Sequence, residues 1–210
     1  MEKLIISIAI GLVLSITVCC YAETTQNDIA DSVIRLHIIA NSDSEADQSV
    51  KLMIRDRIIG EMHERFSDIT DPATALQQIA ESLDEMEQIA QSTLLENGFS
   101  YGAAASLGPA AFPMKTYGNI TLPAGTYTAL RIELGEGAGQ NWWCVMFPPL
   151  CFTDSVNGNL SDQGQDLLKS SLRPDEYDIL TSSKNGEIPV QIRFKVVELW
   201  ESLKQATGIF

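Results

Sequence analysis

Few side chains in this sequence are suited to catalysis. The chain has two histidines, His37 and His63, and four cysteines, of which Cys144 and Cys151 lie far from the N-terminus. Cys144 and His37 are the conceivable nucleophile and base, because a thiol needs help to ionise at neutral pH. Cys144, however, lies in the aromatic run 142–147, where a thiol is more often packed or oxidised. We do not expect an enzyme, and a thiol hydrolase using Cys144 and His37 stays as an alternative.

The sequence also lacks a recognisable metal or cofactor motif. The nearest approach to one is a run of alternating oxygen-bearing residues, Asn41, Asp43, Glu45 and Asp47. Ala46 stands where a calcium loop needs glycine, and helix capping explains the run more simply. The glycines at 135–139 are not followed by the lysine and helix of a phosphate-binding loop. We therefore expect no metal and no cofactor.

Two cations interrupt the apolar face of the helix expected at 46–66. Lys51 and Arg55 fall in the same arc as its apolar residues,. Either their charges lie at the edge of that face in water, or they pair with polar residues of the preceding strand and turn. The second arrangement gives one polar cluster, which is our candidate recognition surface: Arg35, His37, Asn41, Asp43, Lys51 and Arg55.

The candidate recognition surface leads to a prediction that can be tested. If the cluster binds a partner, Arg35→Ala or Lys51→Ala should weaken recognition and leave the domain folded. If these residues only tie the helix to the sheet, the same changes should unfold it. The aromatic residues Trp142 and Trp143 are the next candidates for a contact surface.

Strands and helices must position these side chains. Residues 33–40 alternate between apolar and polar, which predicts a strand with one polar face. Ser44 and Asp47 have capping-box spacing before the helix that runs to about residue 66. The other expected elements are a helix at 72–97, strands at 99–107, 114–120, 126–134 and 142–147, and helices from Pro174 and about Pro189. The glycine run suggests that the last two strands form a hairpin, and the whole predicts an α+β fold with an antiparallel sheet covered by helices.

The N-terminal segment predicts export. Residues 4–22 carry no charged side chain and follow Lys3, which is typical of a signal peptide or a membrane-spanning anchor. The segment either remains as an anchor or is removed after Ala22, and only an uncleaved segment would hold the chain at a membrane. We expect a polar linker at 23–31 and a single extracytoplasmic domain at 32–210. Outside the cytoplasm the pair Cys144 and Cys151 suggests a disulfide, with two buried thiols as the alternative.

The charge of the chain narrows its partners. The formal net charge is −14 at pH 7, and removal of residues 1–22 takes away one acid and one base. Nucleic acids and anionic lipid headgroups are bound mainly by lysine and arginine. Both are therefore disfavoured as partners.

Two stretches of the sequence carry a family resemblance. They are RLHIIANSDSEADQSVKLMIRDR at 35–57 and FPMKTYGNITLPAGTYTALRIELGEGAGQNWWCVMFPPLCF at 112–152. Both closely resemble the stage II sporulation protein R family. The resemblance covers most of the expected domain and is weaker at 67–98 and 153–188.

The resemblance implies an exported signalling protein of endospore formation. Such a protein is made in the forespore and acts in the space between the forespore and mother-cell membranes. Its expected partner is a membrane-embedded aspartic protease that processes pro-sigma E in the mother cell. The resemblance implies no catalytic motif in the signalling protein itself. The alternatives left open are the thiol hydrolase and a membrane-tethered binding module.

Overall fold

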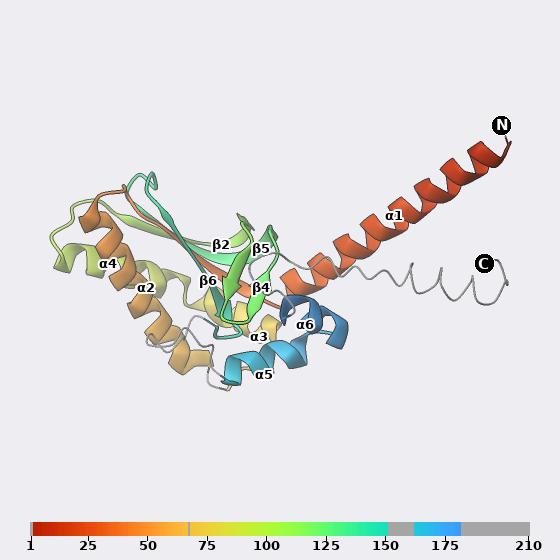
Figure 1. Ribbon diagram of the computed structural model, residues 1–210. Coiled ribbons are helices and arrows are strands. Elements are labelled where there is room, and N and C mark those ends of the chain that lie inside the picture. The colour runs from red at the N-terminus through yellow and green to blue at the C-terminus, as the bar shows by residue number, and fades with distance from the viewer. Residues whose placement is uncertain (1, 67, 151–161, 182–210) are drawn as a thin grey trace.

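The computed structural model describes residues 2–66, 68–150 and 162–181. Figure 1 shows a sheet flanked by helices, with one long helix projecting from it. The elements in chain order are α1 (Glu2–Asp31), β1 (Ile34–Ile39), α2 (Glu45–Phe66), α3 (Pro72–Glu81), α4 (Leu83–Glu96), β2 (Ala103–Phe112), β3 (Lys115–Tyr117), β4 (Ile120–Leu122), β5 (Gly125–Leu134), β6 (Asn141–Phe147), α5 (Asp162–Ser171) and α6 (Pro174–Thr181).

The main sheet is mixed, and this corrects the expectation of an antiparallel sheet. Its strand order is β2-β5-β1-β6. β1 runs parallel to β5 and antiparallel to β6, while β2 runs antiparallel to β5. The predicted hairpin of 126–134 with 142–147 was wrong, because β1 lies between these two strands. The class, α+β, is confirmed.

The composition of β1 explains its central place. All six residues of this strand are buried, on both faces of the sheet. An edge strand would leave one row of backbone groups and part of this apolar surface in water. Two strand spacings, about 10 Å, then separate β5 from β6, and the loop 135–140 is long enough to cross over β1.

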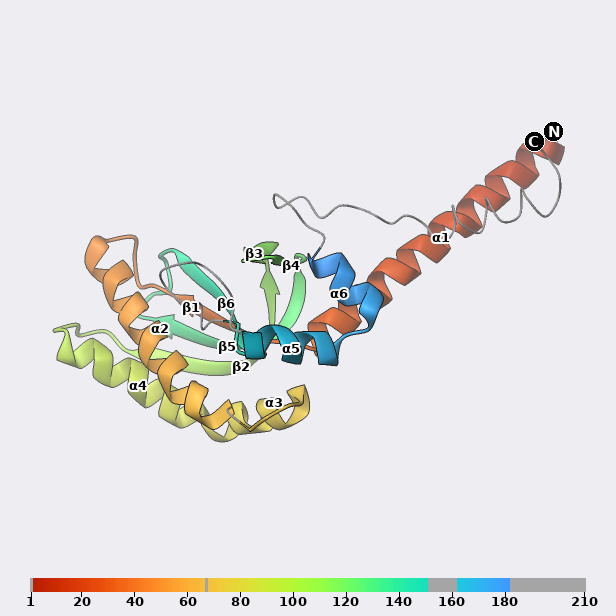
Figure 2. The same ribbon diagram turned by 60° about the horizontal axis from the view of Figure 1, so that its bottom comes forward.

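Helices α2, α3 and α4 cover one face of the sheet, here called the helix face (Figure 2). Alternate strand residues such as Leu36, Ile38 and Ile132 pack there against Ile54, Ile58, Met86 and Leu94. The expected helix over 72–97 is broken in two at Ser82. Its hydroxyl is buried and accepts a hydrogen bond from Arg65 Nη1. The predicted capping role of Ser44 is confirmed, because Ser44 Oγ accepts from Asp47 N–H. Asp71 caps α3 in the same way by accepting from Thr74 N–H.

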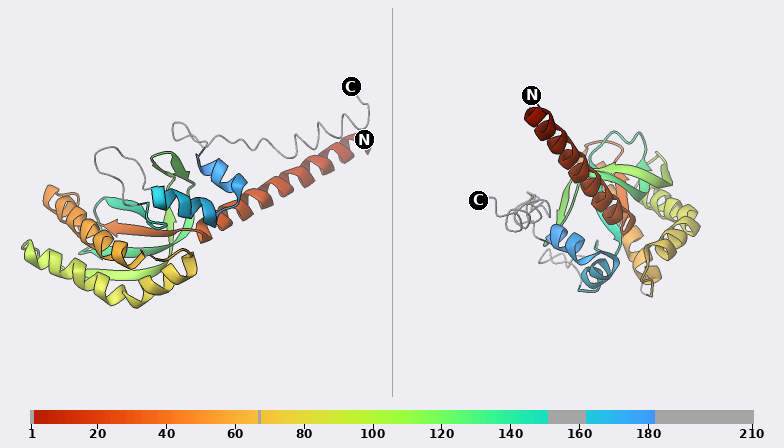
Figure 3. Two further views of the ribbon diagram at one scale, coloured as in Figure 1. Left: turned by 90° about the horizontal axis from the view of Figure 1, so that it is seen from below. Right: turned by 90° about the vertical axis from the view of Figure 1, so that its right-hand side faces the viewer.

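The opposite face of the sheet is here called the second face, and the described residues cover one half of it. The end of α1, the β3–β4 hairpin, α5 and α6 pack there around a second core, as the two views in Figure 3 show. The segment expected as one strand at 114–120 is this short hairpin, turning at Gly118. The helix from Pro174 is confirmed as α6, and α5 was not predicted. The helix expected from about Pro189 lies outside the described residues.

The residues expected as a polar linker, 23–31, continue helix α1. Ile29 and Ala30 are buried against the domain, and Asp28 forms an ion pair with Arg173 at 2.7 Å. Further towards the N-terminus, large apolar side chains from Leu4 to Ile16 are exposed. Among the described residues, no helix meets the length and apolarity required for a membrane span.

Candidate functional site

The predicted cluster is divided between three places in the fold. Arg35, His37 and Trp143 lie on the second face, whereas Lys51 and Arg55 belong to α2 on the helix face. Asn41 and Asp43 lie in the turn between β1 and α2. The cluster fails to form because the β-sheet separates its members, since alternate residues of β1 point to opposite faces.

The turn residues hold the loop 135–140 against β1. Asp43 accepts a hydrogen bond from Gln140 N–H, and buried Lys51 donates to the Gln140 carbonyl at 2.8 Å. Asn41 accepts from Glu136 N–H. Gly139 passes so close to Ser42 that an added Cβ would lie 2.3 Å from the Ser42 carbonyl oxygen. We call this arrangement the turn clasp; it fixes the crossing that lets β1 enter the centre of the sheet.

Asp47 is the acceptor at the centre of the turn clasp. Its buried carboxylate accepts hydrogen bonds from Asn41, Ser42 and Tyr101. Burial acts to raise the pKa of Asp47, but these hydrogen bonds and the contact with Ser44 together hold that pKa below its usual value,. The carboxylate is therefore ionised at neutral pH and binds the turn to the start of β2.

Arg35 lies in an aromatic cage on the covered half of the second face. Its side chain is fully buried, with the guanidinium carbon 4.2 Å from the Phe112 ring centre and 4.9 Å from that of Tyr127. Nε donates to the Cys144 carbonyl at 2.8 Å, and Nη2 donates to the Tyr117 hydroxyl at 2.7 Å. Such a site stabilises the cation through the electron-rich ring faces.

The cage shifts the pKa values of its ionisable members. Burial lowers the pKa of Arg35, but arginine remains protonated at neutral pH. Burial raises the pKa of Tyr127 to about 12. Within the described residues no carboxylate pairs with Arg35, and Nη1 has no hydrogen-bond partner there. Arg35 thus ties β1 to β6 and β3, and its place favours the structural alternative over direct recognition.

His37 lies on the same face, next to the cage. Its ring stacks on Trp143 with centres 3.8 Å apart, and Nε2 lies 2.7 Å from Asn141 Oδ1. Burial lowers the pKa of His37; the Asn141 contact opposes this, and Arg131 adds to it. His37 is therefore neutral at pH 7. It forms a fixed wall on the second face.

The side chains of Cys144 and His37 lie on opposite faces of the sheet. It pairs with Leu36 and faces the helix-side core, whereas His37 pairs with Trp143 and faces the other side of the sheet. The sheet backbone therefore separates the Cys144 sulfur from the His37 imidazole, which removes the geometry that a thiol hydrolase needs. Cys151, the predicted disulfide partner, lies outside the described residues.

Arg55 and Trp142 form a contact on the helix side. The guanidinium carbon lies 4.4 Å from the centre of the Trp142 ring, and Arg55 also pairs with Asp56 at 2.6 Å. The arginine lies at the edge of the apolar face, as the snorkelling alternative predicts. Trp142 and Trp143 thus point to opposite faces of β6 and do not form one aromatic patch.

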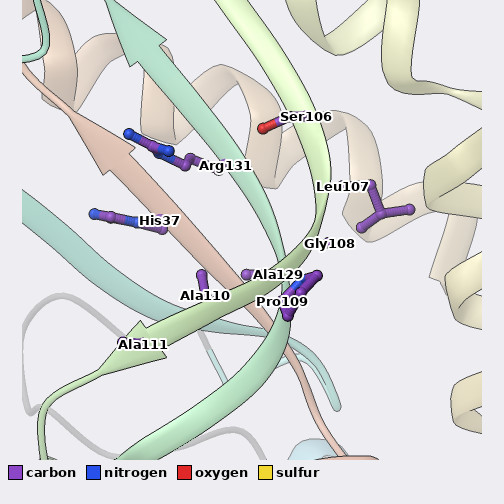
Figure 4. A pocket seen from close by; sticks show the side chains of 9 residues that line it. All are labelled: His37, Ser106, Leu107, Gly108, Pro109, Ala110, Ala111, Ala129 and Arg131. Atoms are coloured by element: carbon purple, nitrogen blue, oxygen red, sulfur yellow. The ribbon is translucent and has the colours of Figure 1, made fainter.

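The uncovered half of the second face holds a polar row. Cross-strand pairing places Trp143, His37, Arg131 and Ser106 next to one another across β6, β1, β5 and β2. Figure 4 shows His37 and Arg131 side by side, with Ser106 opposite on β2. A hollow of about 270 Å³ lies beside the row, lined by residues 106–111 of β2 with His37, Ala129 and Arg131. We take this half of the face as the candidate interaction site.

Sequence reasoning found two members of the row, His37 and Trp143, and missed the others. Arg131 was recognised only as one residue of an alternating strand. Ser106 and Gly108 belong to a strand of small residues, AAASLGPAA at 103–111, which had no obvious function. That run of small side chains, of which the predicted strand 99–107 included only the first part, was the available signal for a hollow.

The fold and this face define an α+β domain that presents a half-covered sheet, with a polar row and a hollow on the uncovered half. The family model for stage II sporulation protein R matches residues 30–157. The chain belongs to the stage II sporulation protein R family.

A curated relative agrees with this membership. The stage II sporulation protein R of Bacillus subtilis (strain 168) is 42% identical over 148 residues, which is 69% of this chain. The match spans 66% of the length of that relative. No solved structure matches the chain significantly.

Proposed function

We propose that this chain is a signalling protein of the second stage of sporulation. It is exported from the forespore and activates a membrane-embedded aspartic protease that processes pro-sigma E in the mother cell. Family membership is the observation that carries the proposal. The fold agrees with the role of a signalling ligand. The stretch 35–57, which carries the family resemblance, supplies side chains that hold strands and turns together, namely Arg35, Asn41, Asp43 and Lys51.

The N-terminal helix supports the proposed route of export. Its exposed apolar residues before Ile16 suit a signal or an anchor,. The helix is in contact with the domain further on, where Tyr21 donates to Asp175 and Thr25 is buried. Removal of residues 1–22 would delete the Tyr21 contact but leave the buried Thr25 and Ile29 in place, so the packing of α1 residues 25–30 is common to a cleaved and an anchored form.

Reconstitution tests the proposal directly. Vesicles containing the protease are mixed with pro-sigma E, with or without this chain on the extracytoplasmic side. We expect the processed sigma factor to appear only when the chain is present. A protease lacking its catalytic aspartate serves as the control. Equal processing with and without the chain would contradict the proposal.

We also predict a structural disulfide between Cys144 and Cys151. Closing this short loop constrains the unfolded chain by about 2–3 kcal/mol. Replacing both residues with serine should lower the free energy of unfolding by about that amount and leave residual signalling. Cys20→Ser is the matched control, because Cys20 is an exposed free cysteine. If the double variant kept its stability but lost all protease activation, a redox or catalytic role would replace the structural one.

A further inference from the structure

The hollow on the second face exists because its floor is made of small residues. Gly108 and Ala110 of β2 lie opposite Ala129 and Tyr127 of β5. Gly108 has no side chain, and a Cβ added there would meet no atom within 4 Å. The floor is therefore apolar and open, next to the wall that His37 forms.

Polar groups lie at one end of this apolar floor. Arg131 and Ser106 are directly opposite each other in the pairing of β5 with β2, which places their Cβ atoms about 5 Å apart on one face. Both donate hydrogen bonds. His37, which completes the wall, is only 7% exposed, and its Nδ1 has no hydrogen-bond partner among the described residues. The hollow thus combines an apolar floor with a cation and a hydroxyl.

Arg131 already holds one carboxylate. Its Nη2 donates to Glu133 at 2.6 Å, and both side chains are about half exposed. A guanidinium has five donors in a planar fork, so Glu133 leaves room for a second acceptor. Exposed pairs of this kind are weak. An incoming carboxylate can therefore bind Arg131 in competition with Glu133.

The edge of β2 disfavours a strand as the occupant. Side chains of α4 bind the outward N–H groups of Ala103 and Ala105, through Gln91 and Glu87. Pro109 removes the next but one outward donor, which blocks a regular ladder. The hollow is accordingly suited to a single inserted side chain and not to an added strand.

From this geometry we propose that the hollow binds an acidic side chain, aspartate or glutamate, of the protein partner. The methylene groups lie over Gly108 and Ala110, and the carboxylate binds Arg131 and Ser106. Because the chain has a net charge of −14, most of its surface repels an acidic group. The positive charge of Arg131 attracts such a group to the hollow. The identity of the partner rests on the proposed function, whereas the ligand chemistry does not.

The ligand chemistry is tested on the full chain without any protease. N-acetyl-glutamate methylamide is titrated into the protein, and the backbone amide resonances of residues 106–108, 110, 111 and 131 are followed by NMR. The neutral probe is N-acetyl-glutamine methylamide. We expect saturable shifts with the acidic probe only. Arg131→Gln should bind about tenfold more weakly, as loss of a charge-assisted hydrogen bond predicts. Glu133→Gln should bind more tightly because the internal competitor is gone.

Filling the hollow provides an independent arm. Gly108→Val should abolish the shifts at an unchanged melting temperature, because the added atoms enter open space. Ala104→Val lies on the same strand and face but outside the hollow, and should bind as the original chain does. Equal binding of the two probes, no binding of either, or an unchanged affinity of Glu133→Gln would each overturn the proposal.

The processing assay then links the hollow to signalling. Arg131→Gln and Gly108→Val should raise the concentration of chain needed for half-maximal processing about tenfold, and Ala104→Val should not. If the unaltered chain fails to stimulate processing, the proposed function is wrong. The titration still shows whether the hollow binds an acidic side chain. If both variants signal normally while folded, the hollow is not the contact for the protease, which overturns the proposal.

Discussion

Replacing Arg35 with alanine should lower the free energy of unfolding by about 3–5 kcal/mol, the range for a large buried side chain whose hydrogen-bond partners become unpaired. The change empties the aromatic cage formed by Phe112, Tyr117 and Tyr127. It also removes the hydrogen bond that Arg35 Nε donates to the Cys144 carbonyl. Urea unfolding of the purified domain measures the loss. Signalling should fall only as far as the folded fraction falls.

Arg35→Met is the matched control for this prediction. Methionine keeps the length of the side chain and packs well against aromatic rings, and apolar replacements of buried charges are often tolerated. We expect it to lose less than half as much stability as Arg35→Ala. If Arg35→Ala unfolded at the same urea concentration as the original chain but failed to activate the protease, the earlier expectation of a recognition role would hold.

Asp47→Asn should destabilise the domain by about 2–4 kcal/mol at pH 7, because hydrogen bonds to a buried carboxylate are stronger than neutral ones. The asparagine side chain has one acceptor oxygen, and its NH₂ group cannot accept a hydrogen bond. Three side chains, Asn41, Ser42 and Tyr101, donate to this position. At least one of these donors would lose its partner. Asp43→Asn is the control, since Asp43 is exposed and keeps an acceptor for Gln140 N–H.

The pH dependence gives Asp47 a second test. The folded-state pKa of Asp47 lies below its usual value, so the unfolded chain binds the proton more tightly. The stabilisation is complete above the unfolded pKa of about 3.9 and is lost as the pH falls through the folded pKa. The difference in unfolding free energy between the original chain and Asp47→Asn should therefore shrink as the pH falls from 5 to 3. A constant difference across this range would contradict an ionised Asp47.

Local patterns in the sequence predicted local structure well. The strand at β1 and the capping residue Ser44 depend on neighbours a few positions away, and the structure has both, although both faces of β1 are buried. The pairing of β1 with β5 depends instead on burial of β1 on both faces. That property favours a central strand, but it names no partner, so the glycine run was interpreted as a hairpin.

The candidate site was harder to predict for the same physical reason. Lys51 and Arg35 were grouped because both are cations near one turn, but the sheet places them on opposite sides. The polar row draws His37, Arg131 and Ser106 from three strands, and only the strand order makes them neighbours. The strand order of the sheet brings residues that are far apart in sequence into one site. The periodicity within a single strand or helix carries no information about that order.

The central place of β1 also sets an order of events during synthesis. β1 is the first strand to leave the ribosome, yet both of its neighbours come after Pro123, and the second is complete only at Phe147. β1 therefore has no pairing partner before β5 is made and only one until β6 is complete, and contacts so distant in sequence form slowly. The main sheet of such a nascent chain forms late in its synthesis. Such a chain can pass through a narrow translocation channel first and close its sheet around β1 on the far side.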